Sequence, residues 1–111
     1  MSWKAGRTTV CEVNGGKLEV REILAGEFFD PPASLDSLKG GDAADNARIL
    51  SDILGGEPGP RRDIVVLNSA AALVVARRAH DLREGILLAA GSIDSGAARR
   101  VLEEMRKIAA A

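Results

Sequence analysis

The chain has 111 residues, a length that suits one domain, and 46% of them are hydrophobic, which is enough for a packed core. Fifteen Lys and Arg residues against 16 Asp and Glu leave a net charge of −1, which argues against a dedicated nucleic-acid or anionic-lipid binder. The single cysteine, Cys11, excludes an internal disulfide, and together with the single histidine, His80, it supplies too few ligands for a His/Cys zinc site.

The N-terminal third is predicted to form a β-hairpin. Two strands, residues 8–13 and 17–22, flank the turn sequence Asn14-Gly15-Gly16. Asn-Gly is favoured in two-residue type I′ turns because both central residues need a positive φ. A turn centred on Asn14-Gly15 places Glu12 opposite Lys17, so we expect an opposite-charge pair beside the turn. A lone hairpin is marginally stable in water, so its apolar face is expected to pack on something.

Four helices are predicted from Gly40 onward. The first starts after the N-cap residue Asp42 and stops at Gly55-Gly56, and the second covers about residues 61–78. The third covers roughly residues 82–90, and the stretch 92–96 is expected to cap a fourth that starts at Ala97. All four carry apolar residues at helical spacing.

The second helix is apolar on nearly every side between Ile64 and Ala76, so we expect it to be enclosed on most sides. At ~1.5 Å per residue this stretch is too short for the ~30 Å core of a bilayer. No apolar stretch of signal-peptide length follows Met1, so we expect a cytoplasmic protein.

The expected fold class is an α/β fragment, a hairpin followed by about four helices. Its single partial domain comprises the hairpin at 1–22, a connector at 23–39 with a short helical turn at 34–38, and a helical part at 40–111. No segment of the chain has the sequence pattern of the buried parallel strands on which an apolar helix of this kind usually packs. A domain of this size lacks the material both to enclose that helix and to complete a sheet.

Two motifs invite a catalytic interpretation and are better explained as helix caps. Gly40-Gly41-Asp42, followed by Asn46, could be a phosphate loop, but no Lys, Ser or Thr follows at the spacing of a P-loop. Asp94-Ser95-Gly96 resembles the surroundings of a nucleophile, but no strand precedes it and His80 is the sole candidate base.

The remaining polar candidates are also expected to be structural. The carboxylate pairs Asp42/Asp45 and Glu103/Glu104 are interpreted as solvated helix faces, not as cation ligands. Asn68, in the middle of the apolar helix, is expected to bond a neighbouring backbone group. The arginine pairs are expected to form salt bridges; they are Arg61-Arg62, Arg77-Arg78 and Arg99-Arg100.

The order of the segments from Gly6 to about Ile108 resembles anthranilate phosphoribosyltransferase, an enzyme of tryptophan biosynthesis. The similar motifs run from Leu38 through Gly-Gly-Asp to Leu50, from Arg62 through Leu-Asn-Ser to Leu73, and from Leu82 through Ile-Asp-Ser-Gly to Ala97. The resemblance implies an α/β domain within a longer enzyme that transfers phosphoribose from PRPP to anthranilate with Mg²⁺.

The phosphate loop and the Asp-Glu metal pair of that family lie upstream of the matching region. We therefore assign no catalytic, PRPP-binding or metal-binding residue in this chain, and the resemblance implies Mg²⁺ and PRPP only for a complete enzyme. Two hypotheses follow. In the first, the chain is the C-terminal segment of such an enzyme and inactive alone. In the second, it is a stand-alone interaction module on the same scaffold. For the segment we expect self-association or a complementing N-terminal segment, whereas a chain that is monomeric, stable and non-catalytic would favour the module.

Overall fold

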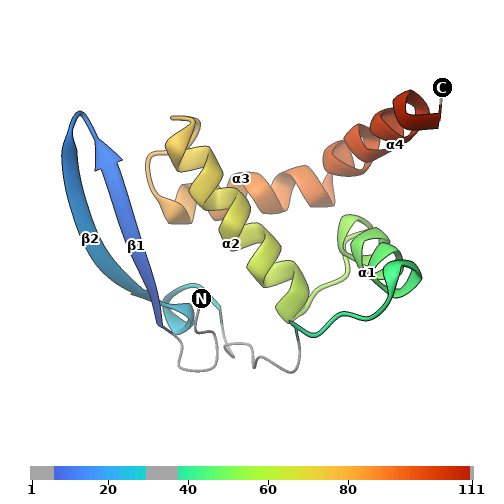
Figure 1. Cartoon of the computed structure of the whole chain (residues 1–111), viewed down its shortest axis with the longest axis horizontal. Coiled ribbons are helices and arrows are strands. Elements are labelled where there is room, and N and C mark those ends of the chain that lie inside the picture. Colours follow the sequence, from blue (N-terminus) through green and yellow to red (C-terminus); the bar gives the residue numbers. More distant parts are fainter. Residues whose placement is uncertain (1–6, 30–37, 111) are drawn as a thin grey trace. The chain divides into compact units, whose positions relative to one another are not determined.

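A computed structural model describes residues 7–29 and 38–110. They form two compact units, one within Met1–Lys39 and one within Gly40–Ala111. The first contains an antiparallel hairpin and a short 3-10 helix, η1 (Ala25–Glu27). The second is entirely helical, and its elements are coloured green to red in Figure 1. Most of the helical turn expected at 34–38 lies outside the described residues.

The hairpin joins β1 (Arg7–Asn14) to β2 (Lys17–Leu24) in a register two residues away from the predicted one. Asn14 pairs with Lys17, so the turn is centred on Gly15-Gly16, both with positive φ, of 59° and 79°. Two glycines meet the φ requirement of a two-residue turn without the steric cost of a Cβ, which an asparagine at the first position would bear.

The expected opposite-charge pair beside the turn is therefore wrong. Glu12 lies opposite Glu19, and the two like charges gain nothing from facing each other. Because the shift is an even number of residues, the two faces of the hairpin keep their predicted members. The apolar face carries Val13, Leu18 and Val20, all of them exposed.

The helical unit begins as predicted. In α1 (Ala43–Leu54), the Asp42 carboxylate accepts a hydrogen bond from the Asp45 backbone N–H at 2.8 Å. The Asp45 carboxylate in turn accepts one from the Asp42 N–H at 3.3 Å, which completes a capping box. The helix ends at Gly55, and Gly56 follows with a φ of 98°.

The second and third helices differ from prediction at their C-terminal ends. α2 (Pro60–Val75) stops short of Arg78 because Arg77 turns into the left-handed region, with a φ of 59°. The N–H groups of Arg77 and Arg78 then donate to the carbonyls of Val74 and Leu73, so the chain closes a Schellman motif without a glycine. α3 (Leu82–Asp94) continues past residue 90 through Ser92 to Asp94.

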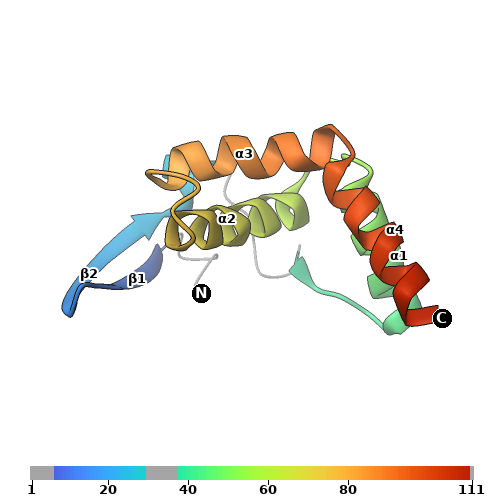
Figure 2. The ribbon, with the colours of Figure 1, turned by 90° about the horizontal axis from the view of Figure 1, so that it is seen from above.

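α2 and α3 approach each other closely at Ala70 and Gly85. Ala70 is fully buried, and a Cβ added at Gly85 would lie only 2.8 Å from the Ala70 carbonyl oxygen and 2.9 Å from its Cα. Gly85 therefore lets the two helix backbones come together where no other residue fits. Figures 1 and 2 both show the two helices lying against each other.

The core of this unit is small. Four buried residues, Ile53, Val66, Ala89 and Ile93, form one cluster contributed by α1, α2 and α3. The last helix, α4 (Ala97–Ala110), has no buried residue and exposes an apolar stripe of Val101, Met105 and Ile108. In the part of the chain that the structure describes, no helix combines the length and apolarity needed to cross a bilayer.

Candidate functional site: an apolar groove between helices

The start of α1 is a closed cap, which confirms the structural interpretation of Gly40-Gly41-Asp42. The Asn46 side chain accepts from the Gly41 N–H at 3.0 Å and donates to the Gly41 carbonyl at 3.1 Å. Together with the capping box, these bonds already use the N–H groups of residues 41, 42 and 45. An incoming phosphate would have to displace two carboxylates and an amide to reach them.

The two glycines of this motif are explained by the side chains of α1 that bond to the backbone just before the helix. A Cβ at Gly40 would meet the Asn46 Oδ1 atom at 2.5 Å, and one at Gly41 would meet the Asp45 carboxylate. The residues that looked like a phosphate loop therefore make room for side chains of their own helix.

Ser95 and His80 do not form a catalytic pair. They flank opposite ends of α3, whose 13 residues span about 20 Å. The Ser95 hydroxyl donates to the Ser92 carbonyl and accepts from the Ala97 N–H, each at 3.3 Å. His80 Nδ1 lies 3.0 Å from a Glu84 carboxylate oxygen, and this hydrogen bond lowers the pKa of Glu84.

Asp94 has a different role from the predicted helix cap. It is the last residue of α3, and its two carboxylate oxygens accept from the Arg62 guanidinium at 2.7 and 3.0 Å. The hydrogen bond from Arg62 lowers the pKa of Asp94, and the same bond raises that of Arg62. This bidentate ion pair joins the start of α2 to the end of α3, and it confirms the expected salt bridge for one of the six paired arginines.

Asn68 is exposed, which contradicts the expectation that the apolar helix encloses it. It lies on an exposed side of α2 together with Ala71 and Val75, and Val75 is 82% exposed. The helix is therefore not enclosed on most sides: Val66, Leu67 and Ala70 are buried, while another face is open. The described residues therefore cover this apolar helix only in part.

Among residues 7–29 and 38–110, no three His, Cys, Asp or Glu side chains come together in a way that could hold a metal ion. Glu103 and Glu104 instead lie near Arg106 and Lys107 on the surface of α4, at 4.0 and 3.3 Å. The donor set that Mg²⁺ prefers is therefore not offered by this part of the chain.

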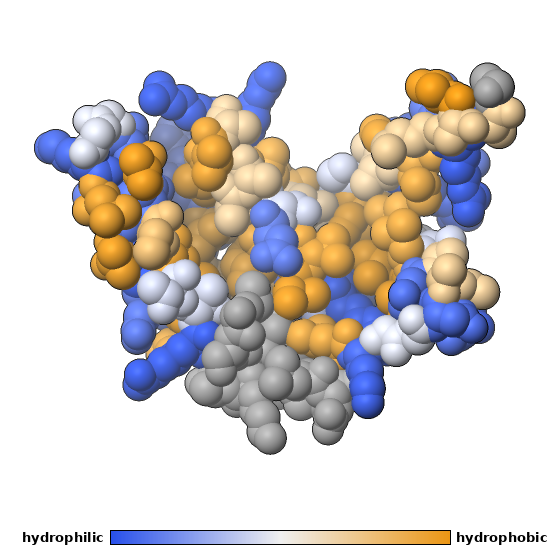
Figure 3. Space-filling model, viewed as in Figure 1, coloured by the Kyte–Doolittle hydropathy of each residue, from blue (hydrophilic) through white to orange (hydrophobic). Residues whose placement is uncertain are grey.

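The helical unit carries an apolar groove of about 770 Å³ that could receive another group. Apolar side chains gather over α2 and α3 in the middle of the face seen in Figure 3. We call this feature the helical groove, and it is lined by Leu54, Val65, Ser69, Ala72, Leu73, Ala76, Arg78, Leu88, Ala89, Ser92, Ile93 and Ala98.

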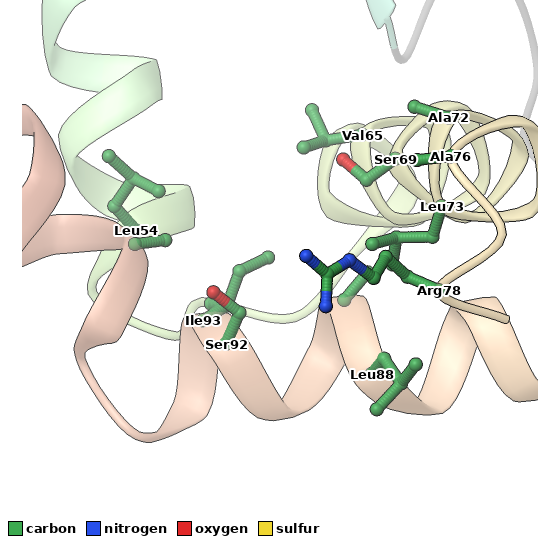
Figure 4. Close-up of a pocket in the computed structure, with 12 residues that line it drawn as sticks. Leu54, Val65, Ser69, Ala72, Leu73, Ala76, Arg78, Leu88, Ser92 and Ile93 are labelled. Carbon is green, nitrogen blue, oxygen red and sulfur yellow. The ribbon is translucent and has the colours of Figure 1, made fainter.

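Three of the lining side chains are polar, and one of these is charged. Figure 4 shows Arg78 extending into the space between α2 and α3, with Ser69 above it on α2 and Ser92 on α3. The left-handed turn at Arg77 places Arg78 there, because it ends α2 and redirects the chain. The sequence predicted Arg78 only as half of an arginine pair that forms salt bridges, and not as a groove residue, because the helix was expected to continue through position 78. The small residues at 69, 72 and 76 of α2, spaced for one side of a helix, were the available signal.

Comparison with known proteins places these observations in a family. Residues 2–99 match the model of the glycosyl transferase family, a/b domain. The chain belongs to this family. It is 49% identical over 100 residues to an anthranilate phosphoribosyltransferase of Symbiobacterium thermophilum, 50% over 106 residues to one of Anaeromyxobacter sp. (strain K), and 47% over 107 residues to one of Rhodopseudomonas palustris (strain HaA2).

These alignments cover 90–96% of the chain but only 29–32% of the relatives. The resemblance deduced from the motifs is thus confirmed over nearly the whole sequence. The same coverage agrees with a hairpin and a set of helices that belong to a larger α/β domain.

Proposed function

We propose that this chain is the C-terminal scaffold segment of an anthranilate phosphoribosyltransferase, the enzyme that joins the phosphoribosyl group of PRPP to anthranilate in tryptophan biosynthesis. One observation carries the proposal. Nearly the whole chain is 47–50% identical to such enzymes, yet it spans less than a third of them. We place the protein in the cytoplasm, where PRPP is available.

The chain by itself is proposed to be inactive. Phosphoribosyl transfer needs groups that offset charge on the departing pyrophosphate, usually a metal ion and preorganised N–H donors. The described acidic residues offer no metal site, and the best candidate donors, at the start of α1, are bonded to Asp42, Asp45 and Asn46. The PRPP and Mg²⁺ sites are therefore proposed to lie in the other part of the enzyme.

What the chain contributes, in this proposal, is a rigid helical layer. The Gly85–Ala70 approach and the Arg62–Asp94 ion pair fix α2 and α3 against each other before any other polypeptide binds. A stand-alone interaction module remains the alternative, and it is less favoured because the similarity to enzymes extends along nearly the whole chain.

Complementation tests this function. The part of the Symbiobacterium enzyme outside the matching segment is produced as a separate polypeptide and mixed with this chain. We expect anthranilate to be consumed in the presence of PRPP and Mg²⁺ only when both polypeptides are present. Turnover by this chain alone, abolished by EDTA, would contradict the proposal, and so would an inactive mixture in which the two polypeptides demonstrably bind each other.

A further inference from the structure

The tip of the hairpin carries an Asn-Gly pair that the turn does not need. The turn is centred on Gly15-Gly16, so Asn14 is the last residue of β1 and pairs with Lys17. Asn14 and both glycines are exposed. Asn14 therefore lies beside a glycine at the surface without forming the turn itself.

An exposed asparagine followed by glycine is chemically reactive toward its own backbone. The nitrogen of the following residue can attack the side-chain carbonyl carbon and close a succinimide ring. A side chain on that residue hinders the approach and stiffens the backbone, and glycine has no side chain. Asparagine is accordingly among the residues that limit the durability of proteins at high temperature.

The structure leaves the two reacting groups unrestrained. The Asn14 carboxamide forms no hydrogen bond within residues 7–29 and 38–110, and Gly15 lies beyond the last paired residues of the two strands. A Cβ added at Gly15 or at Gly16 would meet nothing within 4 Å, so the carboxamide has room to move over the backbone. A two-stranded hairpin is marginally stable, and glycine gains much freedom on opening, so the tip opens at low cost.

The other two asparagines of the chain are held differently. Asn46 accepts from the Gly41 N–H at 3.0 Å and donates to the Gly41 carbonyl at 3.1 Å. Asn68 lies within α2, where the N–H of the following residue belongs to the helix. Neither is followed by glycine, so Asn14 alone combines an unbonded carboxamide with a glycine neighbour.

We propose that Asn14 is a site of spontaneous covalent modification, at which the Gly15 nitrogen displaces the side-chain amide. The new bond joins the Gly15 nitrogen to the Asn14 Cγ atom, and the C–N bond of the carboxamide breaks. The amide group leaves as ammonia and takes the Gly15 proton with it. Water then opens the ring at one of its two carbonyl carbons, which gives aspartate or isoaspartate at position 14. The reaction needs only water and this chain, so it does not depend on the proposed function.

The two products affect the hairpin in opposite ways. Aspartate keeps the backbone and places a carboxylate directly opposite Lys17, where a cross-strand pair of opposite charge is stabilising. Isoaspartate carries the backbone through its own side chain and lengthens it by a methylene just before the turn. The pairing of position 14 with Lys17 is then lost, because a turn of two residues fixes the register of the strands.

Peptide mapping tests the proposal on the folded chain. The chain is incubated at mildly alkaline pH, where the backbone nitrogen loses its proton more readily, and circular dichroism checks that it stays folded. Trypsin releases each asparagine on its own peptide, residues 8–17, 40–48 and 63–77. Mass spectrometry detects the replacement of an amide by a carboxylate, and because the chain has no glutamine, each change belongs to an asparagine.

We expect peptide 8–17 to convert about tenfold faster than the other two peptides, or more. Asn14→Gln should abolish the conversion, because a longer side chain closes a less favourable ring. Gly15→Ala should slow it by about tenfold or more. The matched control is Gly16→Ala, which also adds a Cβ in open space at a positive φ but leaves the neighbour of Asn14 unchanged, so its rate should stay within about threefold.

Three results would overturn the proposal. One is conversion of peptide 40–48 or 63–77 as fast as that of peptide 8–17. Another is equal slowing by Gly15→Ala and Gly16→Ala, which would exclude attack by the Gly15 nitrogen as the sensitive step. The third is a rate for peptide 8–17 more than about tenfold lower in the folded chain than in urea, because the hairpin would then protect Asn14.

Discussion

Two sides of α2 present opposite kinds of surface. On one side Ala70 meets Gly85 so closely that a methyl group does not fit, and Val66 is only 3% exposed. On another side Ala72, Val75 and Ala76 face an open groove or solvent. The helix is apolar on both sides, so hydrophobicity alone does not distinguish them. The difference shows that the chain packs one side of α2 closely against α3 and leaves another apolar side of the same helix open.

The largest effect that sharpens this comparison is expected from two valines on α2. Val66→Ala removes methyl groups from the buried cluster and should lower the free energy of unfolding by about 2–3 kcal/mol. Val75→Ala makes the same change on the open side, where the side chain is 82% exposed, and should change it by less than about 0.5 kcal/mol. Urea denaturation of the isolated chain measures both. Equal losses would mean that the two sides are equally packed.

The next effect concerns two glycines of α3. Gly85→Ala drives a Cβ into the backbone of Ala70 and should destabilise the chain by about 2 kcal/mol. Gly91→Ala meets nothing within 4 Å, so the better helix propensity of alanine should stabilise the chain by up to about 1 kcal/mol. Thermal melts followed by circular dichroism give both values. A stabilising Gly85→Ala would refute the close contact between the helices.

A smaller change is expected where α2 ends beside the groove. Arg77 takes a left-handed conformation that costs a residue with a Cβ roughly 1 kcal/mol. Arg77→Gly should therefore raise the free energy of unfolding by about 0.5–1 kcal/mol while leaving Arg78 in place. The same denaturation experiment measures it, and Arg78→Gly, which alters no strained position, serves as the comparison. A loss of stability at Arg77→Gly would mean that the turn is not formed.

The smallest effect is the pH dependence of the Arg62–Asp94 pair. Because Arg62 lowers the pKa of Asp94, the pair stabilises the chain at pH values above the ordinary aspartate pKa of about 3.9. That contribution is lost as the pH falls through the lowered pKa of the folded state. Asp94→Asn should thus reduce stability at neutral pH and make the acid-induced loss shallower below about pH 4. The free energy of unfolding of both proteins is measured between neutral pH and about pH 3. The same dependence on pH for both proteins in the acid range would contradict the prediction.

Local signals predicted much of the fold. Asp42 and Gly55-Gly56 mark the two ends of the first helix through interactions within a few residues, and the structure confirms both. The errors arose where two local solutions compete. Gly15-Gly16 outcompetes Asn14-Gly15 for the turn, and Arg77 ends α2 although arginine gives no warning of a left-handed residue.

The candidate site could not be predicted in the same way. The helical groove depends on how α1, α2, α3 and α4 diverge, and its lining residues extend from Leu54 to Ala98. Sequence reasoning found that Ile64 to Ala76 is apolar all round and inferred that cover was missing. The prediction wrongly placed Asn68 in the interior. The apolar pattern indicates that a helix packs against other segments, but it does not show which side of the helix stays exposed.

The most direct measurement of the central claim is the fluorescence of a dye that reports exposed apolar surface, recorded with light scattering over micromolar concentrations of the chain. We predict that the isolated chain binds the dye or self-associates, and that adding the remaining part of the Symbiobacterium enzyme suppresses both. A compact monomer that binds no dye, and whose signal that polypeptide leaves unchanged, would contradict an open groove and favour a stand-alone module.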